Sequence, residues 1–404
     1  MSGVAIPGGV PAPPLSPAAA RLEAIGLMLS LAGLVFLAAA AVQGAWLIGS
    51  DGRPYASDFV NLYAAGRLVL EGRAADAYDW AAHGQAEAAA VGYDFGGYYN
   101  WPYPPTFLFA VAPFALLPFV PALFAWIAVT LPLYVAAIAP ILGRRPGLAL
   151  ACAFPAVPWT ISVGQNGFLT AALVGGTLAA WRRHPVLAGV LLGGLTYKPH
   201  FGLLFPVALI AAGRWRTIAA AAVTALLLAV AAGAAFGLES WAAFVRSVAT
   251  TGVLVFAEGR AGIAKQHSLL GLVRWLGGPL ALAWTLQGLL IAAAAVWIAR
   301  LWRGPACFEV KAAGLGAAVL LATPYLYIYD FPVLAVPMAF LIRLGLADGF
   351  RRGEAAALTL AAVLVFLFPF VAVPTGLFAT LIVALVAARR ATVPAPADGP
   401  ADGH

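Results

Sequence analysis

The chain has 404 residues, of which 63% are hydrophobic and 10% are charged, with a formal net charge of +7 and a mean hydropathy of +0.93. A soluble protein of this length needs a far more charged surface, so the composition excludes the soluble globular class. Long apolar runs recur along the chain, and backbone groups in hydrocarbon must be satisfied within their own segment, which favours helices. The alternating pattern of an outer-membrane barrel is absent. The sequence therefore predicts an all-α, polytopic membrane protein.

The two ends of the chain differ from the rest in composition. Residues 1–22 are rich in Pro, Ala and Gly, residues 391–404 are similar, and both predict disordered cytoplasmic tails. The apolar run at 24–48 is too long for a signal-peptide core and no clear cleavage site follows it, so we expect a retained first helix. Residues 23–390 would then form one transmembrane domain.

Basic residues separate the later apolar runs, often in pairs such as Arg182-Arg183 and Arg389-Arg390. Placing these pairs in the cytoplasm satisfies the positive-inside rule, so the net charge reports membrane orientation and not nucleic-acid binding. This constraint predicts about twelve spans and puts both termini in the cytoplasm. The predicted spans are 24–48, 119–142, 147–163, 167–181, 186–197, 200–213, 216–237, 279–301, 311–325, 331–346, 355–372 and 374–388. Several are shorter than the roughly 20 residues that cross a bilayer, so we expect helices that end early, inside a protein-lined cavity open to the outer face.

The first outer loop, residues 51–105, combines acidic and aromatic residues in a chain with few charges elsewhere. Seven of the 16 acidic residues lie between Asp51 and Asp94, which predicts that this loop acts in water at the membrane surface. Its apolar positions predict helices that lie in the membrane interface. Residues 74–91 resemble an exposed helix, on which we expect His83 to be a solvated surface residue.

Asp58 is the acid of greatest interest in this loop, because it precedes an amphipathic run that begins at Phe59. In one interpretation Asp58, or Ser57, caps that helix. In the other, Asp58 is a general base at the lipid–water boundary, where partial desolvation raises the pKa of a carboxylate toward working pH.

Aromatic residues form a second candidate group in the loop. Tyr99, Trp101 and Tyr103 surround a proline-rich entry into the next apolar run, and Tyr63 lies on the helix that follows Asp58. Aromatic and proline residues at a helix entry commonly anchor the chain at the membrane interface. The alternative is a wall on which a sugar ring or prenyl chain stacks, and both functions are compatible.

Polar residues at two later turns are predicted to reach the same face. Gln165 and Asn166 lie between two glycines, which indicates either a simple hairpin hinge or amide donors for sugar hydroxyls. Tyr325 and Asp330 belong to a tyrosine-rich segment before Pro332, where the acid is either structural or part of a sugar site. Ionisable groups at the membrane edge are costly and are therefore candidates for function.

Basic residues on the outer face form the last candidate group. Lys198 has no acidic neighbour in sequence, so it is expected either to ligate a lipid phosphate or to form an ion pair with Asp330. His200 is either a second phosphate ligand or a neutral core histidine. Lys265 and His267 lie together on a basic loop, which predicts a phosphate site or contact with anionic headgroups.

These motifs together resemble glycosyltransferase family 87, whose members have the GT-C fold and include polyprenol-phosphate-mannose-dependent mannosyltransferases. The resemblance is carried by the order and spacing of five segments and covers roughly residues 24–390. They read DFxxxYxAGRxxLxG from Asp58 to Gly72, YD at Tyr78-Asp79, WPYPP from Trp101 to Pro105, GQN from Gly164 to Asn166, and AGVLLGGLTYKPH from Ala188 to His200.

The resemblance implies a bacterial inner-membrane enzyme that works at the periplasmic face. It would transfer a hexose, with mannose as the expected sugar, from a polyprenyl-phosphate donor to a lipid or glycan acceptor, with inversion. The acidic residue of the first outer loop is commonly the base in this class, and Asp58 occupies that position. Because lipid phosphate is a good leaving group and no second acid adjoins Asp58 in sequence, we expect no metal and no cofactor.

A transporter or flippase of a lipid-linked saccharide is the alternative, since it would also line a cavity with aromatic residues and a few charges. Such a protein is expected to carry polar residues in the middle of helices, at corresponding places in two repeated halves. In this chain they gather at one face and the halves do not match.

Overall fold

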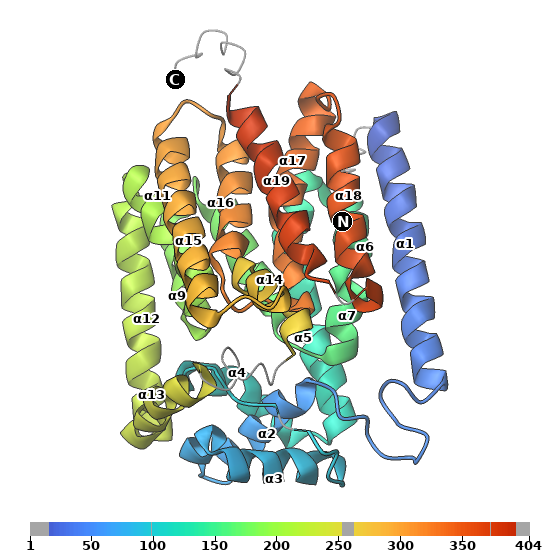
Figure 1. The fold of residues 1–404 in the computed structure, drawn as a ribbon, viewed down its shortest axis with the longest axis vertical. Coiled ribbons are helices and arrows are strands. Elements are labelled where there is room, and N and C mark those ends of the chain that lie inside the picture. The colour runs from blue at the N-terminus through green and yellow to red at the C-terminus, as the bar shows by residue number, and fades with distance from the viewer. Residues whose placement is uncertain (1–15, 98, 253–261, 372, 393–404) are drawn as a thin grey trace, which may run out of the picture.

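The computed structural model describes residues 16–97, 99–252, 262–371 and 373–392. These residues form a bundle of long helices with a layer of short helices at one end (Figure 1). Within the described residues the regular elements are all helical, and none of them is a strand. The prediction of an all-α fold is therefore confirmed.

The layer consists of helices between residues 59 and 116 and of one later helix. These are α2 (Phe59–Leu70), η1 (Ala74–Tyr78), α3 (Trp80–Val91), η2 (Pro105–Phe107), α4 (Leu108–Val111), η3 (Ala112–Leu116) and α13 (Leu238–Gly252). Nine of the twelve residues of α2 are buried, because α2 lies between α3 and the α4–η3 segment. α2 is thus enclosed by protein on most sides, whereas the sequence predicted an amphipathic helix with one exposed face.

The bundle contains the remaining helices. They are α1 (Pro17–Val42), α5 (Phe119–Leu142), α6 (Arg144–Ala153), α7 (Ala156–Val163), α8 (Gly167–Ala180), α9 (Pro185–Gly194), η4 (Leu195–Tyr197), α10 (Pro199–Gly202), α11 (Phe205–Ala211), α12 (Trp215–Phe236), η6 (Ile263–Lys265), α14 (Leu269–Trp275), α15 (Leu280–Arg303), α16 (Phe308–Ala322), η7 (Ile328–Leu334), α17 (Ala335–Asp348), α18 (Glu354–Val371) and α19 (Thr375–Ala391).

In the described part of the chain, six helical segments are long and apolar enough to span a membrane, which supports a multi-pass membrane protein. They are Pro17–Val42, Phe119–Leu142, Trp215–Phe236, Leu280–Arg303, Ile328–Asp348 and Glu354–Val371. A seventh candidate is a pair of helices, Arg145–Ala153 and Ala156–Val163, bent by 60°. The expected count of about twelve is not confirmed, because several predicted spans coincide with helices of only 10 to 17 residues.

The first helix differs from its predicted bounds at both ends. It begins at Pro17, inside the segment expected to be disordered, because the Ser16 hydroxyl accepts a hydrogen bond from the Ala19 amide and caps it. It ends at Val42, not at residue 48. The rest of the N-terminal tail, and residues 393–404 of the predicted C-terminal tail, lie outside the described residues.

The chain direction places the layer at one end of the bundle. α1 runs toward the layer, whereas α19 runs away from it and ends at the opposite end, as Figure 1 shows. Arg389 and Arg390 in the last turn of α19 therefore lie far from the layer. This arrangement puts the acidic outer loop and the basic end of the bundle on opposite sides.

Candidate functional site

Asp58 lies at the start of α2, in the N-cap position, but its side chain makes no capping hydrogen bond. Its backbone angles are those of a right-handed helix, and its side chain is partly exposed. The capping interpretation is therefore not supported by the geometry. A carboxylate at a helix start that does not cap is available for another function.

The surroundings of Asp58 raise its pKa. Burial is the largest cause and brings the pKa to about 6, while the Lys265 ammonium acts in the opposite direction and the Glu87 carboxylate adds to the rise. Lys265 is exposed and comes from η6, and Glu87 comes from α3. Asp58 therefore faces groups from two other parts of the chain, and it holds a proton up to a much higher pH than an ordinary aspartate.

Lys198 and Asp330 form a buried ion pair, with 2.5 Å between Nζ and Oδ1. The second carboxylate oxygen of Asp330 accepts the Tyr327 amide at 3.1 Å, which fixes the start of η7. The Lys198 ammonium also lies over the rings of Phe201 and Tyr329, 5.4 and 5.3 Å from their centroids. Of the two roles that the sequence left open for Lys198, the ion pair with Asp330 is thus present.

The Gly164–Gly167 turn packs between the first outer loop and η7, and its two glycines explain how. Gly164 has a φ of +70° and ends α7, and a Cβ there would lie 2.7 Å from the Cβ of Phe59. A Cβ on Gly167 would overlap the Tyr329 carbonyl oxygen. Only glycine at these two positions lets the turn approach Phe59 and Tyr329 so closely. Because these residues are next to Asp58 and Asp330 in sequence, the turn brings Gln165 and Asn166 toward the segments that carry the two acids.

The two amide residues of this turn are buried and have different partners. Gln165 Oε1 accepts the Tyr103 hydroxyl at 3.3 Å and the Asn166 amide at 3.2 Å. The Asn166 side chain is buried and acts on the Tyr103 hydroxyl, but among the described residues its oxygen and nitrogen make no close hydrogen bond. Buried amides are normally paired, so Asn166 has hydrogen-bonding capacity for a ligand.

Tyr103 interacts electrostatically with both acids. Burial, with contributions from the negative charges of Asp330 and Asp58, raises the pKa of its hydroxyl. Its ring packs on Trp101 and Phe107, with centroids 5.0 and 4.8 Å away. Tyr103 therefore joins the Asp58 side of the site to the Lys198–Asp330 side within one aromatic cluster.

Other aromatic residues extend this cluster. Phe107 stacks between Trp101 and Tyr197 at 5.6 and 4.4 Å. Tyr327 stacks on Tyr329 at 5.7 Å. Trp101 is 2% exposed, so most of its ring surface is already covered by protein.

Two other predicted site residues, Tyr63 and His267, make hydrogen bonds and ring contacts with the protein itself. The Tyr63 hydroxyl donates to the Leu117 carbonyl at 2.9 Å, and its ring packs on Phe59 and Phe119. His267 Nδ1 accepts the Gly376 amide at 3.0 Å, and its buried ring contacts Phe331 and Phe368. The Tyr63 hydroxyl and His267 Nδ1 are thus engaged by protein, whereas His267 Nε2 is buried without a hydrogen-bond partner among the described residues.

Tyr99, His200 and Tyr325 are partly exposed, so part of each side chain is accessible to a ligand. The His200 ring lies beside Phe201 at 5.0 Å, next to Lys198 in sequence, and its Nε2 is buried without a partner. The Tyr325 ring contacts Tyr327 at 4.7 Å.

His83 contradicts its prediction as a solvated surface residue. It is fully buried, and its Nε2 lies 3.5 Å from Oε1 of Glu87, which is also fully buried. The sequence carried a signal for this pair, since a histidine and a glutamate four residues apart lie on one helical face. Because six of the twelve residues of α3 are alanines, its buried side could not be recognised from apolar periodicity.

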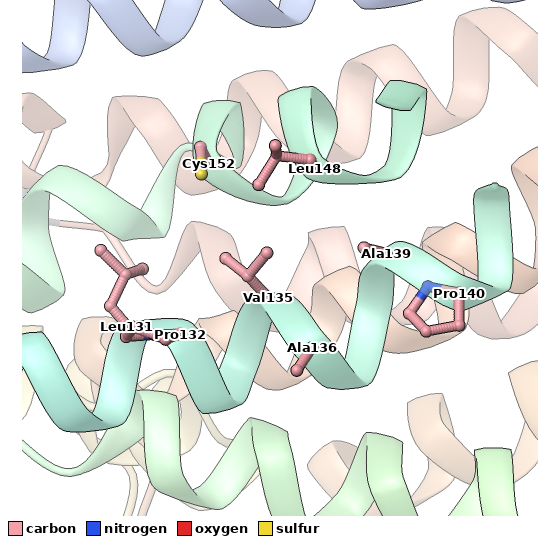
Figure 2. Close-up of a pocket in the computed structure, with 8 residues that line it drawn as sticks. All are labelled: Leu131, Pro132, Val135, Ala136, Ala139, Pro140, Leu148 and Cys152. Atoms are coloured by element: carbon pink, nitrogen blue, oxygen red, sulfur yellow. The ribbon is translucent and has the colours of Figure 1, made fainter. Parts of the chain in front are cut away.

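An apolar cavity of about 810 Å³ lies between α5 and α6 (Figure 2). None of the polar residues named above lines it. Its lining consists of Leu131, Pro132, Val135, Ala136, Ala139, Pro140, Leu148 and Cys152. This lining holds no carboxylate, imidazole or cation, so the cavity lacks the groups that the polar end of the bundle contains.

Among the described residues, no group of three or more His, Cys, Asp or Glu side chains lies close enough together to hold a metal ion. The expectation of a reaction without a metal stays a prediction.

The fold and the polar end of the bundle define a multi-pass helical membrane protein with ionisable groups near the layer of short helices. The profile of glycosyltransferase family 87 matches residues 101–324, more than half of the chain, and the chain belongs to this family. This membership supports a glycosyltransferase with the GT-C type of fold. No curated protein and no solved structure matches the chain. The matched residues include Lys198 but not Asp58, so the role of Asp58 is argued from its surroundings.

Proposed function

We propose that the protein is an inverting glycosyltransferase that moves a hexose, expected to be mannose, from a polyprenyl-phosphate donor to a lipid or glycan acceptor. The reaction would take place at the periplasmic face of a bacterial inner membrane. The observation that carries the proposal is Asp58, a partly buried carboxylate that caps nothing and has a pKa raised to about 6. Such a group is a stronger base than an ordinary aspartate and is still ionised at neutral pH.

In the proposed reaction, Asp58 takes the proton from an acceptor hydroxyl. The acceptor oxygen attacks the anomeric carbon from the side opposite the phosphate, and the bond between that carbon and the phosphate oxygen breaks. The electron pair leaves with the polyprenyl phosphate. Inversion follows from a single displacement of this kind.

The departing phosphate needs positive charge and hydrogen-bond donors. Lys265 is exposed, and its positive charge lowers the pKa of Asp58. Lys198 is a buried ammonium that lies over the Phe201 and Tyr329 rings. We assign phosphate binding to these two lysines, with His200 as a further donor. Asn166, Tyr99 and Tyr325 are assigned to the sugar or acceptor. Tyr63 is left out because its hydroxyl donates to the Leu117 carbonyl, whereas His267 keeps its Nε2 as a candidate donor to the phosphate.

Replacement of Asp58 by Asn tests the assignment. The purified protein in lipid nanodiscs is given radiolabelled polyprenyl-phosphate mannose and a bacterial total lipid extract, and product formation is measured by thin-layer chromatography. We expect Asp58→Asn to lower the transfer rate by about 10²–10⁴-fold, because the amide cannot accept the proton. Thermal stability should not fall, since the change removes a partly desolvated charge.

The matched control is Asp51→Asn. Asp51 is an exposed acid of the same loop, and its Oδ1 accepts the Arg53 amide, a bond that Asn can keep. Near-normal transfer by Asp58→Asn would remove Asp58 as the base. Movement of the donor across a liposome membrane, with no new glycosidic bond in any acceptor, would instead support the transporter alternative.

A further inference from the structure

α3 buries two ionisable residues where a surface helix normally buries apolar ones. Its fully or nearly fully buried positions are His83, Glu87 and Val91, which follow one another at four-residue spacing. His83 and Glu87 have no exposed surface. Burying such a pair costs stability that apolar residues of similar size would not cost, so a role beyond packing is indicated.

The contacts of Glu87 lead to the helix that carries Asp58. Oε1 of Glu87 lies 3.5 Å from His83 Nε2, and Oε2 accepts the Tyr99 amide at 3.2 Å. The carbonyl of the next residue, Asn100, accepts the side-chain amide of Asn61 at 2.6 Å. Asn61 is three residues after Asp58, on the first turn of α2. Glu87 therefore holds the segment that in turn fixes the start of α2.

We propose that Glu87, held by His83, is a positioning residue for Asp58: it fixes the Tyr99–Asn100 segment against α2 and keeps a negative charge beside the base. This inference rests on the proposed function, in which Asp58 accepts the proton of the acceptor.

The charge of Glu87 has a defined effect on Asp58. Burial is the main cause of the raised pKa of Asp58, and the Glu87 carboxylate raises this pKa further, against the opposing effect of Lys265. Burial also raises the pKa of Glu87, whereas His83 and the Tyr99 amide lower it and so favour its ionised form. The titratable and charged groups that face the two acids are Lys265, His83, Tyr99, Tyr103, Tyr327 and Tyr329.

Glu87→Gln removes the charge and keeps the shape and the acceptor for the Tyr99 amide. Without the negative charge, the pKa of Asp58 falls, so the acid limb of the pH–rate profile should move to lower pH, by about 0.5–1 unit for charges several ångströms apart in a partly buried setting. The maximal rate should fall less than tenfold, since a weaker base still accepts the proton. Glu87→Asp, which keeps the charge, should leave the limb closer to its original place.

Glu71→Gln is the matched control. Glu71 is an exposed glutamate at the other end of α2, in surface ion pairs with Arg67 and Arg73, and its removal should not move the limb. An acid limb that stays in place in folded Glu87→Gln would overturn the proposal.

A second measurement does not depend on Glu87→Gln being folded. Coupling between two sites is reciprocal, so Asp58→Asn should lower the pH at which the buried Glu87 carboxyl titrates, as followed by infrared difference spectroscopy with isotope-labelled glutamate. An unchanged Glu87 titration would also overturn the proposal. If Asp58→Asn kept full transfer, the proposed function would fall even with the coupling present, so the two failures are distinguishable.

Discussion

Two buried ion pairs lie at opposite ends of the bundle, and they differ in what remains unpaired. Lys198, which follows η4, pairs with Asp330 of η7, and Arg390 in the last turn of α19 pairs with Glu354 at the start of α18, each with an N–O distance of 2.5 Å. Both pairs are almost fully buried. Distance and burial alone would therefore assign them the same role.

Their further partners separate them. The Arg390 guanidinium donates to both oxygens of Glu354 and to the Gly349 carbonyl, and Glu354 also accepts the Arg351 amide. The planar guanidinium thus joins the end of α19 to the start of α18 through a bidentate ion pair. The groups that it binds are all protein groups. The Lys198 ammonium has three N–H donors. Among the described residues it donates one hydrogen bond to Asp330, and it also lies over the faces of the Phe201 and Tyr329 rings. The pair at the basic end is thus a structural clamp, whereas the outer pair keeps capacity for an anion.

Replacing both members of each pair gives the largest expected difference. Lys198→Met with Asp330→Asn should fold, because removing both charges avoids an unpaired buried ion, but should lose about 10²–10³-fold in transfer through the missing phosphate ligand. Arg390→Met with Glu354→Gln should keep transfer within a few-fold. The measurements are transfer rate and melting temperature, and equal losses of transfer in the two double variants would erase the distinction.

Removing one member of the clamp should instead affect stability. Arg390→Met leaves Glu354 buried without its guanidinium, which is expected to cost about 3–5 kcal/mol of unfolding free energy. Transfer by the protein that remains folded should be unchanged, because α18 and α19 meet there far from Asp58. Thermal unfolding in detergent, with activity normalised to folded protein, checks this expectation; a stable but inactive variant would contradict it.

The smallest expected effect concerns pH at the outer end. As a base, Asp58 works only when ionised, and its pKa is raised to about 6. The transfer rate should therefore be constant above about pH 7 and fall tenfold for each unit below about pH 6. The clamp variants should show the same profile. A limb near pH 4, the ordinary value for an aspartate, would contradict the desolvation of Asp58.

Particular residues show how far the sequence could predict the site. The Gly164–Asn166 motif, Lys198, Asp330 and Asp58 were identified because polar groups are rare in so apolar a chain. The ion pair between Lys198 and Asp330 was one of two stated possibilities, since residues 132 positions apart meet only through helix packing. His83 was misplaced because the alanines of α3 give no apolar stripe from which its buried face could be recognised. The contacts of Tyr63 with the Leu117 carbonyl and of His267 with the Gly376 amide could not be predicted, because they join segments far apart in the chain.

Composition by itself determined the all-helical, membrane-embedded class of this protein, because hydrocarbon leaves a backbone no other way to satisfy its hydrogen bonds. Hydrophobicity also located most helices, but not which of them are long enough to cross a bilayer, since helix ends depend on caps and neighbours. Only the tertiary structure decided which polar side chains are bound by protein and which are not. That difference arises from contacts between distant segments, and in this chain it distinguishes the clamp at one end from the candidate site at the other.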